Sequence, residues 1–469
     1  MACQSAIFGG MRRGVVIFLG IAVVIAVVIA ARLSHPNILW ADDNLPLAAA
    51  IEVARGKVLY RDVWFDKPPL VAWVDLLWGA RAGILLRLAG AAYVIAVAAA
   101  LWQFARSKWS PSEGLLAGFF AAFFLTFGLP SAVIPLASDM LLVMPHVGAI
   151  YFAWRGRAFW SGVAAGIGLL CSSKAIFVFA ACLLWQWRQL PLLLAGFAAP
   201  NALALGWMWL HGSASEYYRQ AWQWGRIYAA NTFVEHPFRE GVTRTANWIG
   251  FQAALVVGAV LAIRRERRLA IWILLSLAGV TLGLRFFPRY YFLLLPPMIV
   301  AASRGWSLVS KNKLAIVALC ALLAVPLIRF GKGYITGWPG DVAMERDSRA
   351  AAEKLRALAR PGDTLFVWGF RPDIFIDSGI PAGTRFLESQ PISGVLADRH
   401  LFSAASIAPE FTSPNLRELV TTNPTWIVDG LGLYNPSLAL ASQAYLSEWL
   451  SHYTEVARTP GSILYRAEK

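Results

Sequence analysis

The sequence is poor in charged residues, which make up 15% of its 469 residues, against about 25% in soluble domains. It contains 27 acidic against 42 basic residues, and only four cysteines and six histidines. Hydrophobic residues reach 58% and gather in blocks of about 20, the length that crosses a bilayer as a helix. This composition excludes an ordinary soluble enzyme and a disordered chain.

The few cysteines and histidines do not have the spacing of a metal site or a disulfide framework. Cys3 precedes the first apolar block, and Cys171, Cys182 and Cys320 lie within later blocks. The histidines form no HExxH or HxxxH pattern. We therefore expect no disulfide and no zinc site.

The net charge of +15 could indicate a nucleic-acid-binding protein, but the distribution of the charge argues against this partner. Basic clusters fall in every second gap between apolar blocks, as the positive-inside rule predicts for cytoplasmic loops. The charge then orients the protein in the membrane, and no nucleic-acid partner is expected. The clusters are Arg12-Arg13, Arg106 with Lys108, Arg155 with Arg157, Arg188, Arg264–Arg268, and Arg304 with Lys311 and Lys313.

The apolar blocks predict an α-helical polytopic membrane protein with about eleven transmembrane helices, its N-terminus inside and its C-terminus outside. The first block is longer than the core of a usual signal peptide, so we expect it to be retained. Residues 1–330 form the predicted transmembrane domain, with a long external loop at 33–81. The expected spans are 14–31, 83–104, 114–130, 139–154, 158–172, 175–187, 190–210, 246–263, 269–284, 290–303 and 314–329.

Residues 331–469 change composition and predict an extracytoplasmic α/β domain, because short strands alternate with helices. No GxGxxG, P-loop or GxSxG motif occurs there, which favours a structural or substrate-guiding role. The expected strands are 363–368, 384–387, 426–429 and a hairpin of 454–458 and 462–466, and the expected helices are 371–378, 415–422 and 445–452.

The first external loop contains two adjacent acids, Asp42 and Asp43, directly after the first span. They precede a predicted amphipathic helix, with Pro46 near its start and Gly56 after its end, that would lie in the membrane interface. Helix capping would explain one acid. Two adjacent acids at membrane level can raise each other's pKa, which suits a general base, and we favour this role.

The same loop contains the string Asp66-Lys67-Pro68-Pro69. Because the residue before a proline is pushed out of the helical region, Lys67 should be extended at the mouth of a helix that Pro68 begins. A phosphate would suit a lysine at a helix N-terminus. A surface ion pair between Asp66 and Lys67 explains the residues equally well.

Further charges lie where the outer ends of spans are expected. Asp139 begins the fourth span and could be a helix cap, and Lys174 lies between two short apolar blocks and could snorkel to the interface. Arg285 and Arg289 are outside, against the positive-inside bias, and Arg87 is near the outer end of the second span. Several cations on one side of a bilayer suggest a shared anionic ligand.

The string WADDNLPLAAAIEVARGKVLYRDVWFDKPPL resembles the first external loop of GT-C membrane glycosyltransferases. It is most similar to the branch that contains protein O-mannosyltransferases and lipid A aminoarabinose transferases. Two positions depart from the pattern of this branch, Asp43 where Glu is usual and Ala175 where Gly is usual. The residues that match in order are Asp42-Asp43, Gly56, Tyr60, Lys67–Leu70, Arg87-Leu88, Ser138-Asp139, Ser173-Lys174, Arg289-Tyr290 and Pro296-Pro297.

This resemblance implies an inverting glycosyltransferase, of the hexosyl or pentosyl class, that moves a sugar from a polyprenyl-phosphate donor to an extracytoplasmic lipid, glycan or protein. Asp42 and Asp43 would be catalytic, with Asp42 as the base. The cations that would bind the donor phosphate are Lys67, Lys174 and Arg289, supported by Asp66, Arg87, Asp139 and Arg285.

The implied chemistry needs no cofactor, although it leaves room for a divalent cation near Asp42, Asp43 or Asp139. The implied location is the plasma (inner) membrane, where the enzyme would glycosylate components of the cell envelope. The alternative function is a secondary transporter or a flippase for lipid-linked substrates, but a transporter should contain internal repeats and midplane charges, which the sequence lacks.

Overall fold

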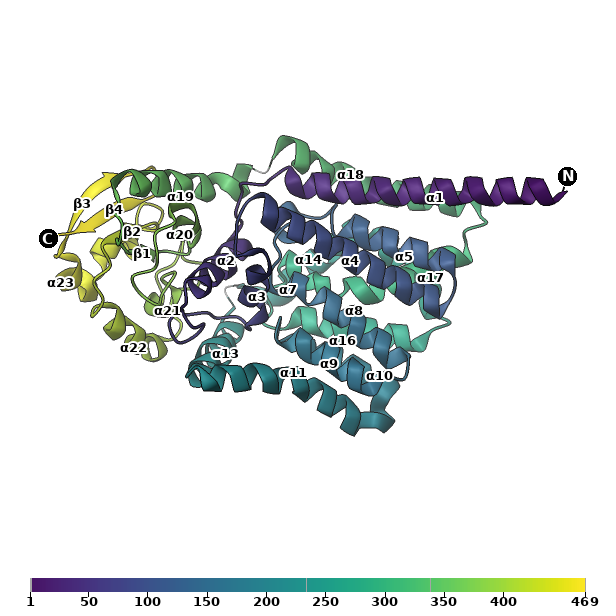
Figure 1. Ribbon diagram of the computed structural model, residues 1–469, viewed down its shortest axis with the longest axis horizontal. Helices are drawn as coiled ribbons and strands as arrows, with labels where there is room; N and C mark the ends of the chain where they lie inside the picture. Colours follow the sequence, from purple (N-terminus) through teal and green to yellow (C-terminus); the bar gives the residue numbers. More distant parts are fainter. Residues whose placement is uncertain (1, 233, 338, 469) are drawn as a thin grey trace.

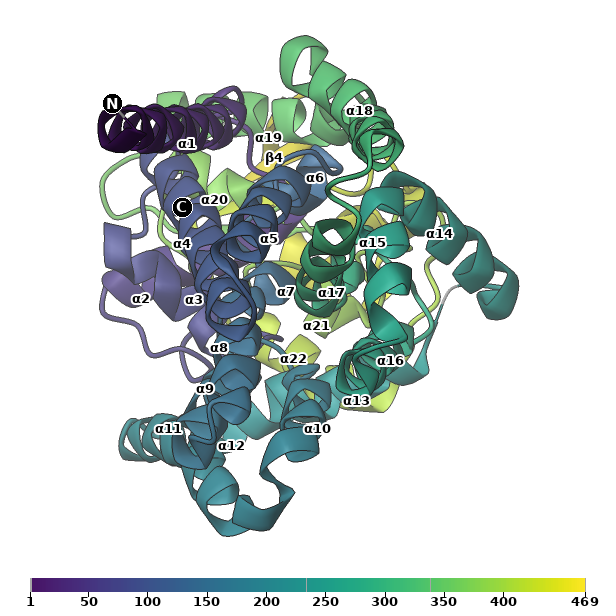
Figure 2. The same cartoon turned by 90° about the vertical axis from the view of Figure 1, so that its right-hand side faces the viewer.

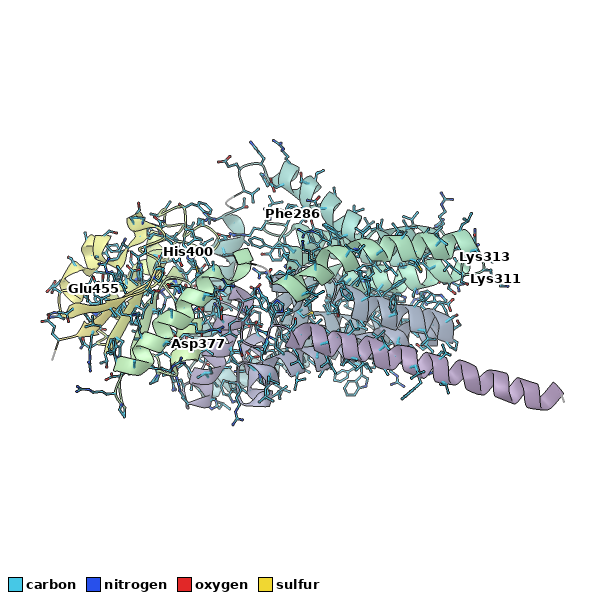
Figure 3. All side chains as sticks on the ribbon, turned by 90° about the horizontal axis from the view of Figure 1, so that it is seen from above. Phe286, Lys311, Lys313, Asp377, His400 and Glu455 are labelled. Atoms are coloured by element: carbon cyan, nitrogen blue, oxygen red, sulfur yellow. The ribbon has the colours of Figure 1, made fainter. Side chains whose placement is uncertain are left out.

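The computed structural model describes residues 2–232, 234–337 and 339–468 of an elongated molecule. A bundle of helices forms one end and a small unit with a β-sheet forms the other, so the two chain termini lie at opposite ends (Figure 1). Lys311 and Lys313, in one of the basic clusters, lie at the end of the bundle far from the sheet (Figure 3). This arrangement is the one expected if the basic clusters face the cytoplasm and the C-terminal unit lies on the opposite side of the membrane.

Each of the eleven expected spans overlaps a helix of the bundle. Seen along the long axis, α1, α11 and α18 lie on the outside and α17 lies nearer the middle (Figure 2). The bundle helices are α1 (Ala2–Leu33), α4 (Ile84–Lys108), α5 (Pro111–Phe124), α8 (Val143–Trp154), α9 (Ala158–Leu169), α10 (Ala175–Gln186), α11 (Leu190–Leu210), α15 (Ala253–Ile263), α16 (Arg267–Thr281), α17 (Leu295–Leu308) and α18 (Lys313–Thr336).

Fewer of the described helices are long enough to cross a bilayer than the sequence predicts. Within the described ranges, four helical stretches are long and apolar enough to cross a bilayer: Gly14–Leu33, Ile84–Lys108, Ala175–Leu210 and Lys313–Thr336. A pair bent by 89°, Pro237–Phe251 with Ala253–Ile263, could be a fifth. A helix of 12 residues, such as α9, is only about 18 Å long against a hydrocarbon core of about 30 Å. The polytopic helical class is confirmed, and the count of eleven stays a prediction.

Close helix packing in the bundle depends on small residues. Helices α9 and α11 meet at Gly162 and Gly196, where an added Cβ would overlap the backbone carbonyl of Leu193 or Phe159 on the facing helix. Only glycine allows two backbones to approach this closely, which is the usual way that helices associate in a membrane.

Short elements fill the space between the bundle and the C-terminal unit (Figure 1). Helix α2 (Ala41–Ala54) begins five residues before Pro46, and nine of its residues are buried. It contacts α20 of the C-terminal unit, and its buried residues 43–50 lie on all of its faces, so the predicted amphipathic pattern is not found. Its position in the membrane interface stays a prediction. The remaining elements on this side of the bundle are α3 (Leu70–Trp73), η1 (Val74–Trp78), α6 (Pro130–Val133), α7 (Ser138–Leu141), α12 (Ala214–Tyr217), η3 (Tyr218–Gln223), α13 (Trp224–Ala230), α14 (Pro237–Phe251) and η4 (Pro288–Leu293), whereas η2 (Trp187–Gln189) joins α10 to α11 at the far end (Figure 1).

The C-terminal unit contains a four-stranded sheet in the order β1-β2-β4-β3, parallel between β1 and β2 and antiparallel elsewhere. Its strands are β1 (Leu365–Trp368), β2 (Trp426–Asp429), β3 (Tyr453–Arg458) and β4 (Ile463–Ala467). Its helices are α19 (Pro339–Leu358), α20 (Asp373–Ser378), α21 (Gln390–Ser393), α22 (Pro409–Leu419), η5 (Pro436–Leu438), η6 (Leu440–Ser442), η7 (Ala444–Leu446) and α23 (Ser447–Leu450).

The predicted strand 384–387 does not form. Its backbone instead meets the first loop, because the carbonyl oxygen of Arg385 accepts a hydrogen bond of 2.7 Å from the backbone N–H of Trp64. The Arg385 side chain also contacts Glu216, so this segment connects the C-terminal unit to two external segments of the bundle. The other predicted strands are confirmed within one or two residues.

Candidate active site

A cavity of about 530 Å³ lies where the bundle meets the C-terminal unit. It is lined by the start of α2, the loop before α3, the segments that begin α7 and α10, helix α13, the segment around η4, and the C-terminal unit. Of the nine predicted site residues, the cavity brings together seven: Asp42, Asp66, Lys67, Asp139, Lys174, Arg285 and Arg289. The two others, Asp43 and Arg87, do not line it.

Asp42 forms an ion pair with Arg289 across the cavity. Asp42 is in the first turn of α2, and Arg289 follows Pro288 at the start of η4. Both residues also line a second cavity of about 270 Å³, together with Trp40 and Phe287. The pair therefore stands between two open spaces, where its carboxylate can meet a reacting group.

Lys174 points into the protein and does not snorkel to the interface. Its Nζ lies 2.9 Å from Asp139 Oδ1, with only 8% and 10% of the two side chains exposed. The same Nζ lies 3.1 Å from the ring centroid of Tyr290, a cation–π contact. Ser138 connects the two segments, since its hydroxyl donates to the carbonyl of Cys171 at 2.5 Å. These contacts hold a buried positive charge at the cavity wall.

Lys67 lies at the cavity in a tightly held loop. Its Nζ is 2.7 Å from Asp66 Oδ1, and its backbone carbonyl accepts a hydrogen bond of 2.7 Å from the Tyr60 hydroxyl. Tyr60 is fully buried and has a φ of 71°, a conformation that costs free energy for a side chain of this size. The helix after Pro69 has only four residues, so the predicted helix mouth is a single turn and Lys67 supplies most of the positive charge.

Asp43 and Arg87 form a buried ion pair behind the cavity. Arg87 donates to Asp43 Oδ2 at 2.7 Å and to the carbonyl of Ile38 at 2.6 Å, and its guanidinium lies 5.4 Å from the centre of the Trp40 ring. The two charged side chains are 2% and 1% exposed. They attach the start of α2 to α4 and thus position the neighbouring Asp42, so the interpretation of Asp43 as a second catalytic acid needs correction.

Arg285 lines the cavity but connects three segments. It pairs with Asp398 of the C-terminal unit and donates to the carbonyl oxygens of Tyr228 at 2.9 Å and Asn231 at 2.5 Å. Its guanidinium also lies 3.8 Å from the centre of the Tyr228 ring. These contacts indicate that Arg285 holds the C-terminal unit and α13 together, and its expected role as a supporting residue of the site stays a prediction.

A third cavity, of about 350 Å³, continues from the second between α5, α14, α17 and α18. It shares Leu129, Ala132 and Pro288 with the second cavity. Most of its other lining residues are apolar or aromatic, among them Phe124 and Trp248. An apolar chain therefore has a lined path from the Asp42–Arg289 pair into the bundle.

No protein-family model matches the sequence, and no curated protein matches it. The structure, however, is similar along nearly its whole length to ArnT from Cupriavidus metallidurans bound to undecaprenyl phosphate, with a TM-score of 0.63 at 15% identity over 96% of this chain and 97% of that one. This is a GT-C fold. The apo form of the same ArnT has a TM-score of 0.59, again at 15% identity, over 97% and 98% of the two chains.

The oligosaccharyltransferase of Archaeoglobus fulgidus in its apo form is a more distant structure, with a TM-score of 0.50 at 11% identity over 96% of this chain and 74% of that one. Identities this low concern the fold alone. They confirm, at that level, the resemblance to GT-C glycosyltransferases that the first loop carries.

The acids of this GT-C fold do not gather around a metal position. Asp42, Asp43 and Asp139 each contact a different cation. Among the residues that the structure describes, no three His, Cys, Asp or Glu side chains come together as potential metal ligands. The expectation that the reaction needs no cofactor stays a prediction.

Sequence reasoning missed the cavity residues of α13 and of the C-terminal unit, notably Tyr228, Gln390, Asp398 and His400. None belongs to a motif, and their place depends on how the C-terminal unit sits on the bundle. Gln390 orders this wall, because its amide donates to Glu388 at 3.2 Å and accepts from the backbone N–H of Ala397 at 2.9 Å. The one available signal was that the C-terminal unit must face the external loops.

Proposed function

We propose that this protein is an inverting membrane glycosyltransferase that moves a sugar from a polyprenyl-phosphate donor to an extracytoplasmic acceptor. The observation that carries the proposal is that Lys67, Lys174 and Arg289, from three distant parts of the chain, line one cavity together with Asp42. Cations in a partly closed site stabilise the charge that grows on a leaving phosphate. The similarity of fold to an ArnT bound to undecaprenyl phosphate supports this class of donor.

In the proposed reaction, the acceptor nucleophile attacks the anomeric carbon of the sugar and gives its proton to Asp42. The bond between the anomeric carbon and the phosphate oxygen breaks, and its electron pair stays on the phosphate. Direct attack inverts the anomeric configuration. Lys67, Lys174 and Arg289 stabilise the phosphate, and the isoprenyl chain takes the apolar path of the third cavity.

The proposed location is the inner (plasma) membrane, with the N-terminus cytoplasmic and the C-terminal unit extracytoplasmic. The basic cluster at Lys311 and Lys313 supports this orientation because it lies at the end of the bundle far from the sheet (Figure 3). The donor then meets its acceptor outside the cytoplasm, where no nucleotide sugar is present and a lipid carrier is needed.

Purified protein in nanodiscs, supplied with polyprenyl-phosphate-linked pentoses, hexoses and amino sugars and with a membrane-lipid and envelope-glycan extract, tests the proposal. We expect one donor class to be consumed, with release of free polyprenyl phosphate and a new glycosylated product by mass spectrometry. A protein that consumes no donor but moves a lipid-linked sugar across proteoliposomes would be a flippase and would overturn the assignment.

A further inference from the structure

The cavity wall formed by the C-terminal unit differs in charge from the wall formed by the bundle. The bundle and its loops supply Lys67, Lys174 and Arg289. The C-terminal unit supplies polar groups and no cation within the described lining: its polar side chains there are Gln390, Asp398 and His400. A phosphate therefore belongs on the bundle side, and a neutral, hydroxyl-rich group belongs on the other.

His400 is the one of these three whose side chain has no partner of its own in the described protein. The residue is 6% exposed and lines the cavity, and among the described residues its hydrogen bond to a side chain is made by its backbone carbonyl, which accepts from the Asn435 amide at 2.8 Å. Gln390 and Asp398, by contrast, are engaged by Ala397 and Arg285. The ring lines the cavity without a partner in the described protein, so a ligand in the cavity can supply one.

The chemistry of this imidazole suits a hydroxyl better than a phosphate. Burial and the nearby Arg371 lower the pKa of His400 to about 4, so the ring is neutral at physiological pH. A neutral imidazole has one N–H donor and one acceptor nitrogen, and a hydroxyl both donates and accepts. A phosphate oxygen only accepts, so it would use the N–H and leave the acceptor nitrogen of the ring without a partner.

The position of His400 is fixed from both sides of the cavity. Its neighbour Asp398 is paired with Arg285, and Arg399 donates to the carbonyl of Asn231 at 2.9 Å. Figure 3 shows His400 on the side of the C-terminal unit that faces the bundle. The segment is thus held against the cavity by contacts that leave the ring itself available.

We propose that His400 hydrogen-bonds a hydroxyl or amino group of the sugar being transferred, so that the C-terminal unit forms the sugar-specificity wall of the active site. The inference rests on the proposed function. The sugar is attached directly to the phosphate, so a phosphate on Lys67, Lys174 and Arg289 places the ring in the same cavity. The C-terminal unit then recognises the sugar of the donor in addition to covering the cavity.

The test compares wild type, His400→Ala and His400→Asn for two properties: kcat/KM with the sugar-linked donor, and affinity for polyprenyl phosphate without a sugar. His400→Ala should lower kcat/KM on the order of tenfold, the usual effect of one lost hydrogen bond. Affinity for polyprenyl phosphate should not change, and His400→Asn, which keeps a donor and an acceptor, should recover part of the rate. The matched control is His452→Ala, at an exposed histidine of the same unit.

A series of donors that each lack one hydroxyl makes the test specific. Wild type should lose about tenfold in kcat/KM with the one deoxy donor that removes the partner of His400, and His400→Ala should lose nothing further with that donor. Equal losses of kcat/KM in both proteins for every deoxy donor, or a parallel loss of polyprenyl-phosphate affinity in His400→Ala, would overturn this inference and leave the proposed function standing. A wild-type protein that transfers no sugar from any donor would overturn the proposed function together with it.

Discussion

Replacing Asp42 by asparagine should separate the chemistry of the site from the binding of its phosphate. Asparagine keeps the shape of the side chain but cannot take a proton. Loss of a general base lowers the rate by a factor of roughly 10²–10⁴. The pair with Arg289 is partly open to solvent, with side-chain exposures of 17% and 32%, so its loss should cost at most about 1 kcal/mol of stability.

The same substitution has an opposite expected effect on binding. Arg289 loses its carboxylate partner and becomes available to phosphate, so affinity for polyprenyl phosphate should stay equal or rise by up to about fivefold, the factor that corresponds to 1 kcal/mol. Transfer rate, polyprenyl-phosphate affinity and melting temperature are measured on the same protein in nanodiscs. Asp62→Asn is the matched control, since Asp62 is in the same loop but pairs with the exposed Arg61.

Full turnover by the Asp42→Asn protein would move the base to another residue, with Asp139 the next acid in the cavity. A loss of rate that comes with an equal loss of polyprenyl-phosphate affinity would refute the reasoning differently. Asp42 would then be a binding residue, and the fall in rate would follow from an empty site.

Three further predictions follow from the contacts. Lys67→Ala should lower kcat by about 10²–10³, as removal of an oxyanion donor does. Lys67→Arg should restore only part of kcat, because a planar guanidinium does not replace a compact ammonium. Equal rates in wild type and both variants would place the phosphate elsewhere. Asp43→Asn should lower the melting temperature strongly, since leaving Arg87 buried without its counter-ion costs about 3–5 kcal/mol; an inactive variant with wild-type stability would restore Asp43 as a catalytic acid. Burial raises the pKa of Glu388 to about 8, so the folded state keeps a proton that the unfolded state loses above about pH 4.5. The melting temperature should therefore fall as the pH rises from about 5 to about 8, Glu388→Gln should reduce this dependence, and an unchanged pH profile in that variant would contradict it.

Two of the cavity residues that the sequence predicted, Lys174 and Arg289, are charges that their local surroundings do not explain. Lys174 has no loop around it, and Arg289 lies outside against the orienting bias. Such conflicts between a residue and its local pattern are where functional sites are expected. The fold class was predicted from other signals, namely the length of the apolar blocks and the alternation of short strands with helices at 365–467.

The role of Asp43 could not be read from the sequence because it depends on the direction of a side chain. Successive residues on a helix differ by about 100°, so when Asp42 faces the cavity, Asp43 faces α4 and Arg87. Adjacent acids look equivalent in a sequence and are not equivalent on a helix. For a related reason His400 was missed, since it lies in a segment between α21 and α22 whose place is set by tertiary contacts alone.

The three cations of the site have carboxylate partners in this structure: Lys67 with Asp66, Lys174 with Asp139, and Arg289 with Asp42. A phosphate entering the cavity must therefore compete with carboxylates, which lowers its affinity but keeps the charged side chains in place and limits the cost of leaving them unpaired. The competition has a chemical consequence at one pair only. When the donor phosphate takes Arg289, Asp42 loses the partner that holds its negative charge, its basicity rises, and it can accept the proton of the acceptor. On the proposed function, the base is thus activated by the arrival of the donor, so the substitution Arg289→Ala should weaken phosphate binding while leaving Asp42 basic in the empty site.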